Sequence, residues 1–410
     1  MFHVKHGKDK IMSKKIFDNE YTERRNKVLK AIPDSYFKGH YNPKKILNYG
    51  TSYSLIISER NNGKSTSMLI CILLAWQKFG YPSVWVRRMS ESLKTHNIGQ
   101  MFDKIWSMGI VPNIKKYDGI EFKSGAFRGY WSQKDRKEYD KPFLYTKAIN
   151  GGETTKGTAD YKDVMFIVFD EFLSRDKYLP NEYVLFSNTM YTLIRETYDC
   201  CIVLLGNPVS WESPYFREFG IKKVRDIQQG TIKCFVGKNP HTSISVEMCG
   251  LTQRNKKADI INDRFFGFEN KQLESMKFGT WETPLYPRIS LNKIDNLKLI
   301  TRNVYLQYED NYICLELYNS DTTDLFILAR PYFDIPTNTF GDLMIYSVSS
   351  MTLYPLKYRQ AKILSNDKLL NLILMLYKSD RFFYSDNTTG ETVRIFMQEF
   401  TLARPRFFIK

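Results

Sequence analysis

Residues 58–66, Ser-Glu-Arg-Asn-Asn-Gly-Lys-Ser-Thr, constrain this chain more than any other stretch. They follow the apolar run 53–57 and lead into an apolar stretch, 65–79, whose length suits a helix. A strand, a tight loop ending in Gly-Lys-Ser and a helix are the parts of a phosphate-binding loop. Backbone N–H groups of such a loop point at a di- or triphosphate, and the helix N-terminus adds a favourable dipole. The motif therefore predicts a nucleotide site.

Individual side chains of this loop receive specific roles. Lys64 is expected to reach the β- and γ-phosphates, and the Ser65 hydroxyl is expected to ligate Mg²⁺. Arg60 either touches the γ-phosphate or a catalytic glutamate, or it is exposed to solvent. The consensus has Gly where Ser58 stands, so the motif alone also fits a chance polar turn before a helix. The expected ATP ligands are Ser58, Arg60, Asn62, Gly63, Lys64, Ser65 and Thr66.

An acidic pair ends a second apolar run. The run 164–169 shows no alternation, which indicates a strand buried on both faces of a central sheet, and it leads into Asp170 and Glu171. This is a Walker B pattern, in which Asp170 holds Mg²⁺ and Glu171 orients and deprotonates the attacking water. An ordinary strand-end turn would have the same two residues. The order of the two motifs favours ATP binding and hydrolysis.

Further polar residues follow the neighbouring elements. Strands and helices alternate here, which predicts an α/β fold with a mostly parallel sheet and a site at the strand carboxyl ends. Asn207 ends the next buried strand, so its amide is expected beside Asp170, unless it only forms an Asn-Pro turn. Arg195 lies late in the intervening helix, where it either reaches a neighbouring subunit or complements the helix dipole. Arg87 and Arg88 either contact nucleic acid or close their strand.

Composition indicates the kind of partner. The formal net charge is +16, with positive residues dispersed along the chain, which favours a polyanion such as nucleic acid over a merely solvated basic face. The cysteines lack CxxC spacing and the histidines are scattered, so a zinc site is not expected. No apolar stretch has the length of a membrane span, so no membrane partner is expected.

Changes in composition and hydrophobic pattern along the chain divide it into four expected parts. Residues 1–40 are charged and indicate an N-terminal extension or partner-binding arm, within which residues 1–11 form a dispensable leader if Met12 is the start. The other parts are a P-loop ATPase domain, a small helical linker subdomain and a C-terminal α/β domain, at residues 41–240, 241–292 and 293–410.

Six short segments occur in a characteristic order between residues 41 and 220. They are Tyr41-Asn42-Pro43, Val86-Arg87-Arg88, Asp170-Glu171-Phe172, Pro180-Asn181-Glu182, Leu193-Ile194-Arg195 and Gly206-Asn207-Pro208. This order resembles the genome-packaging (encapsidation) ATPases of small podophages that package protein-primed linear DNA. Ser58 departs from the glycine of that family.

The resemblance implies an additional-strand, conserved-glutamate ATPase of the FtsK–HerA/terminase kind. It implies ATP and Mg²⁺ as cofactors and double-stranded DNA as substrate. The expected assembly is a homomeric ring, a pentamer, at the portal of a procapsid, with the need for a packaging RNA left open. Its implied location is the host cytoplasm and transiently the portal vertex, not the mature virion.

The resemblance also assigns residue roles. Lys64 and Ser65 carry over as phosphate and Mg²⁺ ligands, and Asp170 and Glu171 as the Walker B pair. Arg195 falls where such enzymes place an arginine finger that acts on the neighbouring subunit. Lys156 lies near the position of a basic residue that acts between subunits in that family. The alignment of this chain with the family is shifted by about one position there.

The C-terminal domain is implied to resemble an RNase H-like nuclease that no longer cuts. Cutting needs a carboxylate cluster that holds two metal ions. Glu316 lies in the first expected strand, 312–317, Asp386 follows a later one, and Asp321 is a spare. Because no complete cluster is evident, we predict a domain that binds portal or nucleic acid without cutting.

Three other functions fit parts of the sequence. The first is a large terminase with an active nuclease. The second is a replicative helicase or other DNA translocase. The third is a non-enzymatic capsid- or portal-binding protein with a decayed phosphate loop, which would show no DNA-stimulated ATPase activity.

Overall fold

A ten-stranded sheet organises the first of the two units into which the chain divides, Met1–Glu282 and Thr283–Lys410. The structure is a computed structural model. It describes residues 22–103, 105, 117–133, 136–151, 161–174, 178–195, 197, 199–211, 213–221, 224–236, 242–250 and 252 of the first unit, and 286–289, 294, 297–308, 311–319, 325–333, 344–347 and 368–407 of the second.

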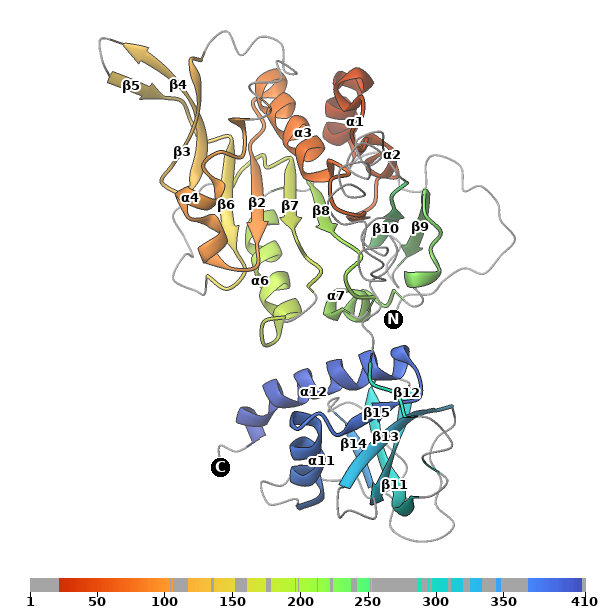
Figure 1. Cartoon of the computed structure of the whole chain (residues 1–410). Helices are drawn as coiled ribbons and strands as arrows, with labels where there is room; N and C mark the ends of the chain where they lie inside the picture. The colour runs from red at the N-terminus through yellow and green to blue at the C-terminus, as the bar shows by residue number, and fades with distance from the viewer. Residues whose placement is uncertain are drawn as a thin grey trace, which may run out of the picture. The chain divides into compact units, whose positions relative to one another are not determined.

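The sheet is parallel at its centre and antiparallel at its edges. Its strands run in the order β3-β4-β6-β2-β7-β8-β1-β10-β9, with β5 paired to β4 (Figure 1). The pairs from β6 to β10 along this order are parallel, which confirms the predicted mostly parallel α/β sheet. The strands are β1 Tyr53–Ile57, β2 Ser83–Arg87, β3 Gly119–Lys123, β4 Ala126–Gln133, β5 Arg136–Tyr139, β6 Leu144–Ala148, β7 Phe166–Asp170, β8 Cys201–Gly206, β9 Thr231–Val236 and β10 Ser243–Met248.

Helices cover both faces of this sheet, which explains why β7 is apolar at every position before its last. Successive strand side chains point to opposite faces. Phe166 and Val168 join the core that includes α3, and Ile167 and Phe169 join the core that includes α6. The helical elements are α1 Glu23–Ala31, η1 Asp34–Phe37, α2 Lys44–Leu47, α3 Lys64–Phe79, η2 Ser90–Leu93, α4 Thr95–Ile98, α6 Glu182–Ile194, α7 Pro214–Glu218 and η4 Val224–Asp226.

Helix α1 belongs to the core, so the interpretation of residues 1–40 as an appendage is wrong for its described part. Val28 and Leu29 are buried in the same cluster as α3. The Arg25 guanidinium, whose residue is 2% exposed, donates to the carbonyl oxygens of Thr51 (3.0 Å) and Cys200 (3.3 Å). The charged composition of this segment concealed a buried arginine whose donors satisfy backbone acceptors near the starts of β1 and β8.

Replacing Arg25 by Ala is expected to lower the free energy of unfolding by about 3 kcal/mol, because it empties a buried site and leaves two carbonyl groups without a donor. Urea or guanidinium unfolding measures this. Lys30→Ala, an exposed change on the same helix, is the control and should stay within about 0.5 kcal/mol of the parent. An effect of Arg25→Ala as small as that of Lys30→Ala would mean that the Arg25 hydrogen bonds do not stabilise the domain.

Residues 90–98 form two separate short helical elements, η2 and α4, with Lys94 in an extended conformation between them. One expected domain boundary in the first unit needs correction. Strand β10 lies within the expected linker 241–292, yet it pairs with β1 in the main sheet. Its polar residues concealed it, because Ser245 and Glu247 are buried and bonded to Thr51 and Tyr41. Residues 253–285, most of the expected linker, lie outside the described residues.

The described residues of the second unit form a five-stranded sheet and two helices. Its strands follow the order β14-β11-β12-β13-β15, antiparallel from β11 to β13. The elements are β11 Lys298–Tyr308, β12 Asn311–Asn319, β13 Leu325–Tyr332, β14 Met344–Ser347, α11 Lys368–Lys378, β15 Phe382–Tyr384 and α12 Asn387–Phe407. The strand predicted as the first of this unit, 312–317, is β12, and β11 precedes it. Likeness to an RNase H-like domain stays a prediction.

Candidate nucleotide site

The loop after β1 has the backbone that phosphate binding requires. Gly63 has φ +86°, and a Cβ atom there would lie 2.6 Å from Nδ1 of His40, so no other residue fits without displacement. Helix α3 starts at Lys64 directly after it, and Asn61 also has a positive φ of 66°. The loop therefore makes its turn with the glycine that the motif predicts.

The sheet order brings this loop to the acidic pair. Strand β8 lies between β1 and β7, with Gly206 opposite Ile57 and Leu205 opposite Asp170. Ser65 Oγ donates to Asp170 Oδ1 at 3.3 Å, and Lys64 Nζ donates to Asn207 Oδ1 at 2.6 Å. Four of the residues singled out in the sequence thus meet at one edge of the sheet.

The donor set fits a nucleotide with Mg²⁺. The Ser65 hydroxyl and the Asp170 carboxylate converge, and oxygen ligands of this kind suit a hard cation. Burial raises the pKa of Asp170, and burial lowers the pKa of Lys64. Because burying either charge is unfavourable, both groups would gain from opposite charges brought by a bound metal nucleotide.

Arg87 is a site residue whose contacts the sequence did not reveal. Its Nη2 lies 2.8 Å from Asp170 Oδ2, and its Nη1 lies 2.5 Å from Glu171 Oε2. Strand β2, which ends at Arg87, is the neighbour of β7 on the side away from β8. Arg88, the next residue, donates to the carbonyl oxygens of Glu171 and Phe172. Both arginines thus engage the acidic end of β7 or the chain that follows it, and the alternative of a nucleic-acid contact gains no support from their geometry.

The remaining loop residues occupy different environments. Ser58 is buried, with its hydroxyl donating to the Glu59 carbonyl and its N–H to the Gly206 carbonyl, so a small side chain is accommodated where the consensus has glycine. Asn62 is buried and donates to the Gly250 carbonyl. Arg60 is exposed, while Thr66 is half-buried. Of these four residues, Ser58 and Asn62 are therefore the buried ones.

Two predicted residues lie away from this cluster. Arg195 is exposed and follows directly after α6, a position that leaves its role on a neighbouring subunit a prediction. Lys156 lies outside the described residues, so its role stays a prediction as well. Within the described part of the chain, no helix is both long and apolar enough to span a membrane.

The central sheet, the loop and the acidic pair define a P-loop ATPase fold. Residues 36–231 match the family model described as Podovirus DNA encapsidation protein (Gp16). The resemblance found in the sequence is thereby confirmed over this part of the chain.

Similar proteins agree with this match. The chain is 27% identical over 184 residues to the DNA packaging protein of Bacillus phage phi29, and 30% identical over 179 residues to that of Bacillus phage B103. These alignments cover 44% and 43% of this chain, and the chain spans about half the length of these relatives, 50% in both cases. A chain of the bacteriophage Phi-29 viral genome packaging motor assembly shares the fold at 17% identity, with a TM-score of 0.50 over 88% of this chain and 99% of that one.

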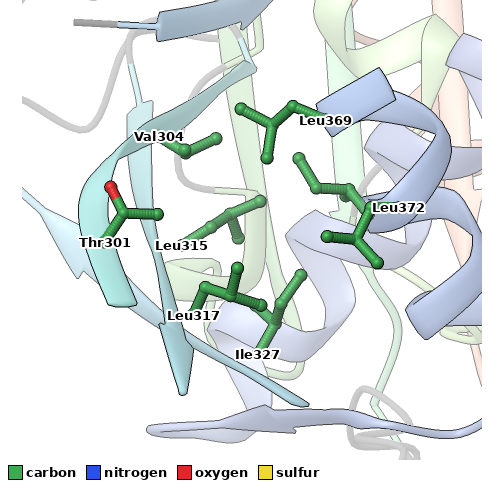
Figure 2. A pocket seen from close by; sticks show the side chains of 8 residues that line it. Thr301, Val304, Leu315, Leu317, Ile327, Leu369 and Leu372 are labelled. Atoms are coloured by element: carbon green, nitrogen blue, oxygen red, sulfur yellow. The ribbon is translucent and has the colours of Figure 1, made fainter. Parts of the chain in front are cut away.

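The second unit contains a pocket, but it is not a metal site. Figure 2 shows an apolar gap between the sheet and α11. Among its described lining residues, Thr301 is the one polar side chain, the others are aliphatic and none is a carboxylate. The lining residues are Thr301, Val304, Leu315, Leu317, Ile327, Leu369, Leu372 and Ile373.

The carboxylates expected in this unit have structural partners. Glu316 pairs with Arg330 of the adjacent strand at 2.9 Å. Asp386 precedes α12 and accepts from the Thr389 N–H at 2.8 Å, which is the bond of an N-cap. Asp321 lies outside the described residues, and β11 contains no acidic residue. Within the described residues, no group of three potential metal ligands is found.

A pair of substitutions at Asp386 separates capping from catalysis. Asp386→Ala is expected to lower the free energy of unfolding by about 1 kcal/mol, whereas Asp386→Asn keeps an acceptor and should cost only a few tenths. The parent and both variants are expected to show no DNA cleavage with Mn²⁺. Plasmid nicking that both changes abolish would instead support the alternative of an active terminase nuclease.

Proposed function

We propose that this protein is an ATP-driven motor that moves double-stranded DNA through a portal into a procapsid. The observation that carries the proposal is the convergence of Lys64, Ser65, Asp170 and Asn207 at one sheet edge. The match of residues 36–231 to an encapsidation family supports DNA packaging as the process that ATP hydrolysis at this site would drive.

Each residue of the site has a place in ATP hydrolysis. Lys64 binds the phosphates, and Ser65 and Asp170 hold Mg²⁺, which neutralises phosphate charge when it is bound. Glu171 accepts the proton of the attacking water, and Asn207 orients that water or the γ-phosphate. Arg195 of one subunit stabilises the transition state in the next, as arginine fingers do.

The partners follow from charge and from the family. A net charge of +16 suits a sequence-independent, salt-sensitive grip on DNA phosphates. The relatives carry the name DNA packaging protein, and we extend this role to the present chain. We propose a ring, pentameric by resemblance, that acts at the portal. Its C-terminal unit is proposed to bind portal or nucleic acid without cutting DNA. Such a ring would act in the host cytoplasm.

The ATPase rate with and without DNA and procapsids tests the proposal. We expect hydrolysis stimulated by DNA and further by procapsids, with the DNA contribution falling as salt rises. Strand displacement without procapsids would support a helicase instead. No hydrolysis under any of these conditions would support a non-enzymatic portal-binding protein.

A further inference from the structure

A buried carboxylate lies behind the acidic pair, and the hydrolysis mechanism does not use it. The Glu182 side chain is 0% exposed and receives the Arg88 guanidinium, whose Nε lies 2.8 Å from Oε2. It also accepts the Tyr215 hydroxyl at 2.7 Å and the Leu179 N–H at 2.7 Å. The Arg88 guanidinium lies 5.2 Å from the centre of the Tyr178 ring.

The same arginine holds the turn that carries the catalytic glutamate. Arg88 Nη1 donates to the Glu171 carbonyl oxygen at 3.2 Å, and Nη2 donates to the Phe172 carbonyl oxygen at 2.7 Å. Glu171 has φ 61°, a left-handed conformation that is unfavourable for a residue with a side chain. Arg88 therefore fixes a strained turn at the point where Glu171 leaves β7.

Glu182 connects this turn to the far end of α6. It is the first residue of the helix, and Arg195 follows the last one, Ile194 (α6 in Figure 1). The helix is a rigid element, with Phe186, Met190 and Leu193 buried in the core. A shift of the Glu171 turn that pulls on Arg88 would thus pass through Glu182 to the position of Arg195.

We propose that Arg88 is a positioning residue that couples the Glu171 turn in one subunit to the Arg195 that this subunit presents to its neighbour. The inference rests on the proposed function, because it requires Arg195 to act between subunits. A buried ion pair by itself is a poor source of stability compared with apolar side chains of similar volume. The fork of Arg88, which serves two backbone carbonyls and one carboxylate, instead suits a geometric role.

Two conservative variants test whether Arg88 positions the Glu171 turn within its own subunit. Arg88→Lys keeps the charge but loses the fork, and Glu182→Gln keeps the shape but loses the charge. Each is expected to lower kcat for ATP about tenfold or more and to leave KM within about twofold, because the nucleotide ligands are unchanged while the Glu171 turn moves. Arg330→Lys, which alters the Arg–Glu pair of the second unit, is the control and should leave kcat unchanged. An unchanged kcat in both variants would overturn the proposal.

Mixed rings test the coupling itself. Subunits with Glu171→Gln cannot hydrolyse ATP but supply Arg195, and subunits with Arg195→Ala have an intact site but lack the arginine; together they should regain activity. Adding Arg88→Lys to the Glu171→Gln subunits should lower this regained activity about tenfold, although those subunits perform no hydrolysis themselves. Thermal unfolding of each variant checks its fold.

The outcomes of the mixed rings are distinct. Full activity after Arg88→Lys is added would mean that Arg88 affects hydrolysis only in its own subunit, which would overturn the coupling. No regained activity in the reference mixture would overturn the coupling by removing the role of Arg195 between subunits, while DNA-stimulated hydrolysis by the parent would still support the proposed function. No stimulated hydrolysis by the parent would remove the proposed function itself.

Discussion

Replacing Glu171 by Gln is expected to lower the DNA-stimulated ATPase rate by about 10²–10⁴-fold, because the amide cannot accept the proton of the attacking water. The glutamate side chain is 67% exposed and contacts Arg87, and it takes no part in the hydrogen bonds that join Lys64 to Asn207 and Ser65 to Asp170. ATP binding should therefore stay within about threefold of the parent, since a lost base changes kcat and not ground-state binding. Steady-state hydrolysis and fluorescent-nucleotide titration measure the two quantities.

The matched control is Glu91→Gln. Glu91 is 66% exposed and pairs with Lys94 on the same unit, so this change removes an equally exposed carboxylate away from the site. It should leave the rate unchanged. A normal rate in Glu171→Gln would falsify the assignment of Glu171 as the base. An inactive parent would be a separate outcome and would support a decayed phosphate loop.

Replacing Arg195 by Ala is expected to lower turnover by about 10³-fold or more while ATP still binds, because an arginine finger acts on transition-state charge. The residue is exposed and directly follows α6, as a role on a second copy of the chain requires. Single-turnover hydrolysis and nucleotide titration, both in the presence of DNA, separate the rate from the affinity.

Arg136→Ala serves as the comparison, since it removes an exposed arginine from β5. It should retain the parent rate. If Arg195→Ala hydrolyses ATP as fast as Arg136→Ala, the finger assignment is wrong. If it is slow but mixing with Glu171→Gln subunits restores nothing, the arginine acts within its own subunit.

Local pattern was sufficient to predict the elements that carry the motifs. The loop at Gly63, the continuous apolar strand before Asp170 and the strand ending at Gly206 all have short-range signals, and each lies where predicted. The assignment of β10 to a linker and of α1 to an appendage was wrong because their polar residues are buried through hydrogen bonds to partners far along the chain. A buried polar residue looks like a surface residue until its partner is known.

The site residues that belong to a motif could be predicted from the sequence. The residues whose partners depend on the order of the strands could not. Nothing in the letters Arg87-Arg88 distinguishes a nucleic-acid contact from an ion pair. Their partners, Asp170, Glu171 and Glu182, follow only from the adjacency of β2 and β7 and from the placement of α6. Long-range pairing of this kind has no signature within a window of neighbouring residues.

The sequence by itself determined the phosphate loop, the acidic pair and the order of strands and helices between them. These depend on local backbone geometry and hydrophobic period, which short stretches encode. Only the tertiary structure decided that β8 separates β1 from β7, that Asn207 contacts Lys64 and that two arginines hold the acidic turn. The physical reason is that strand order follows from packing of the whole sheet, and charged side chains take their partners from the strands that this packing makes adjacent.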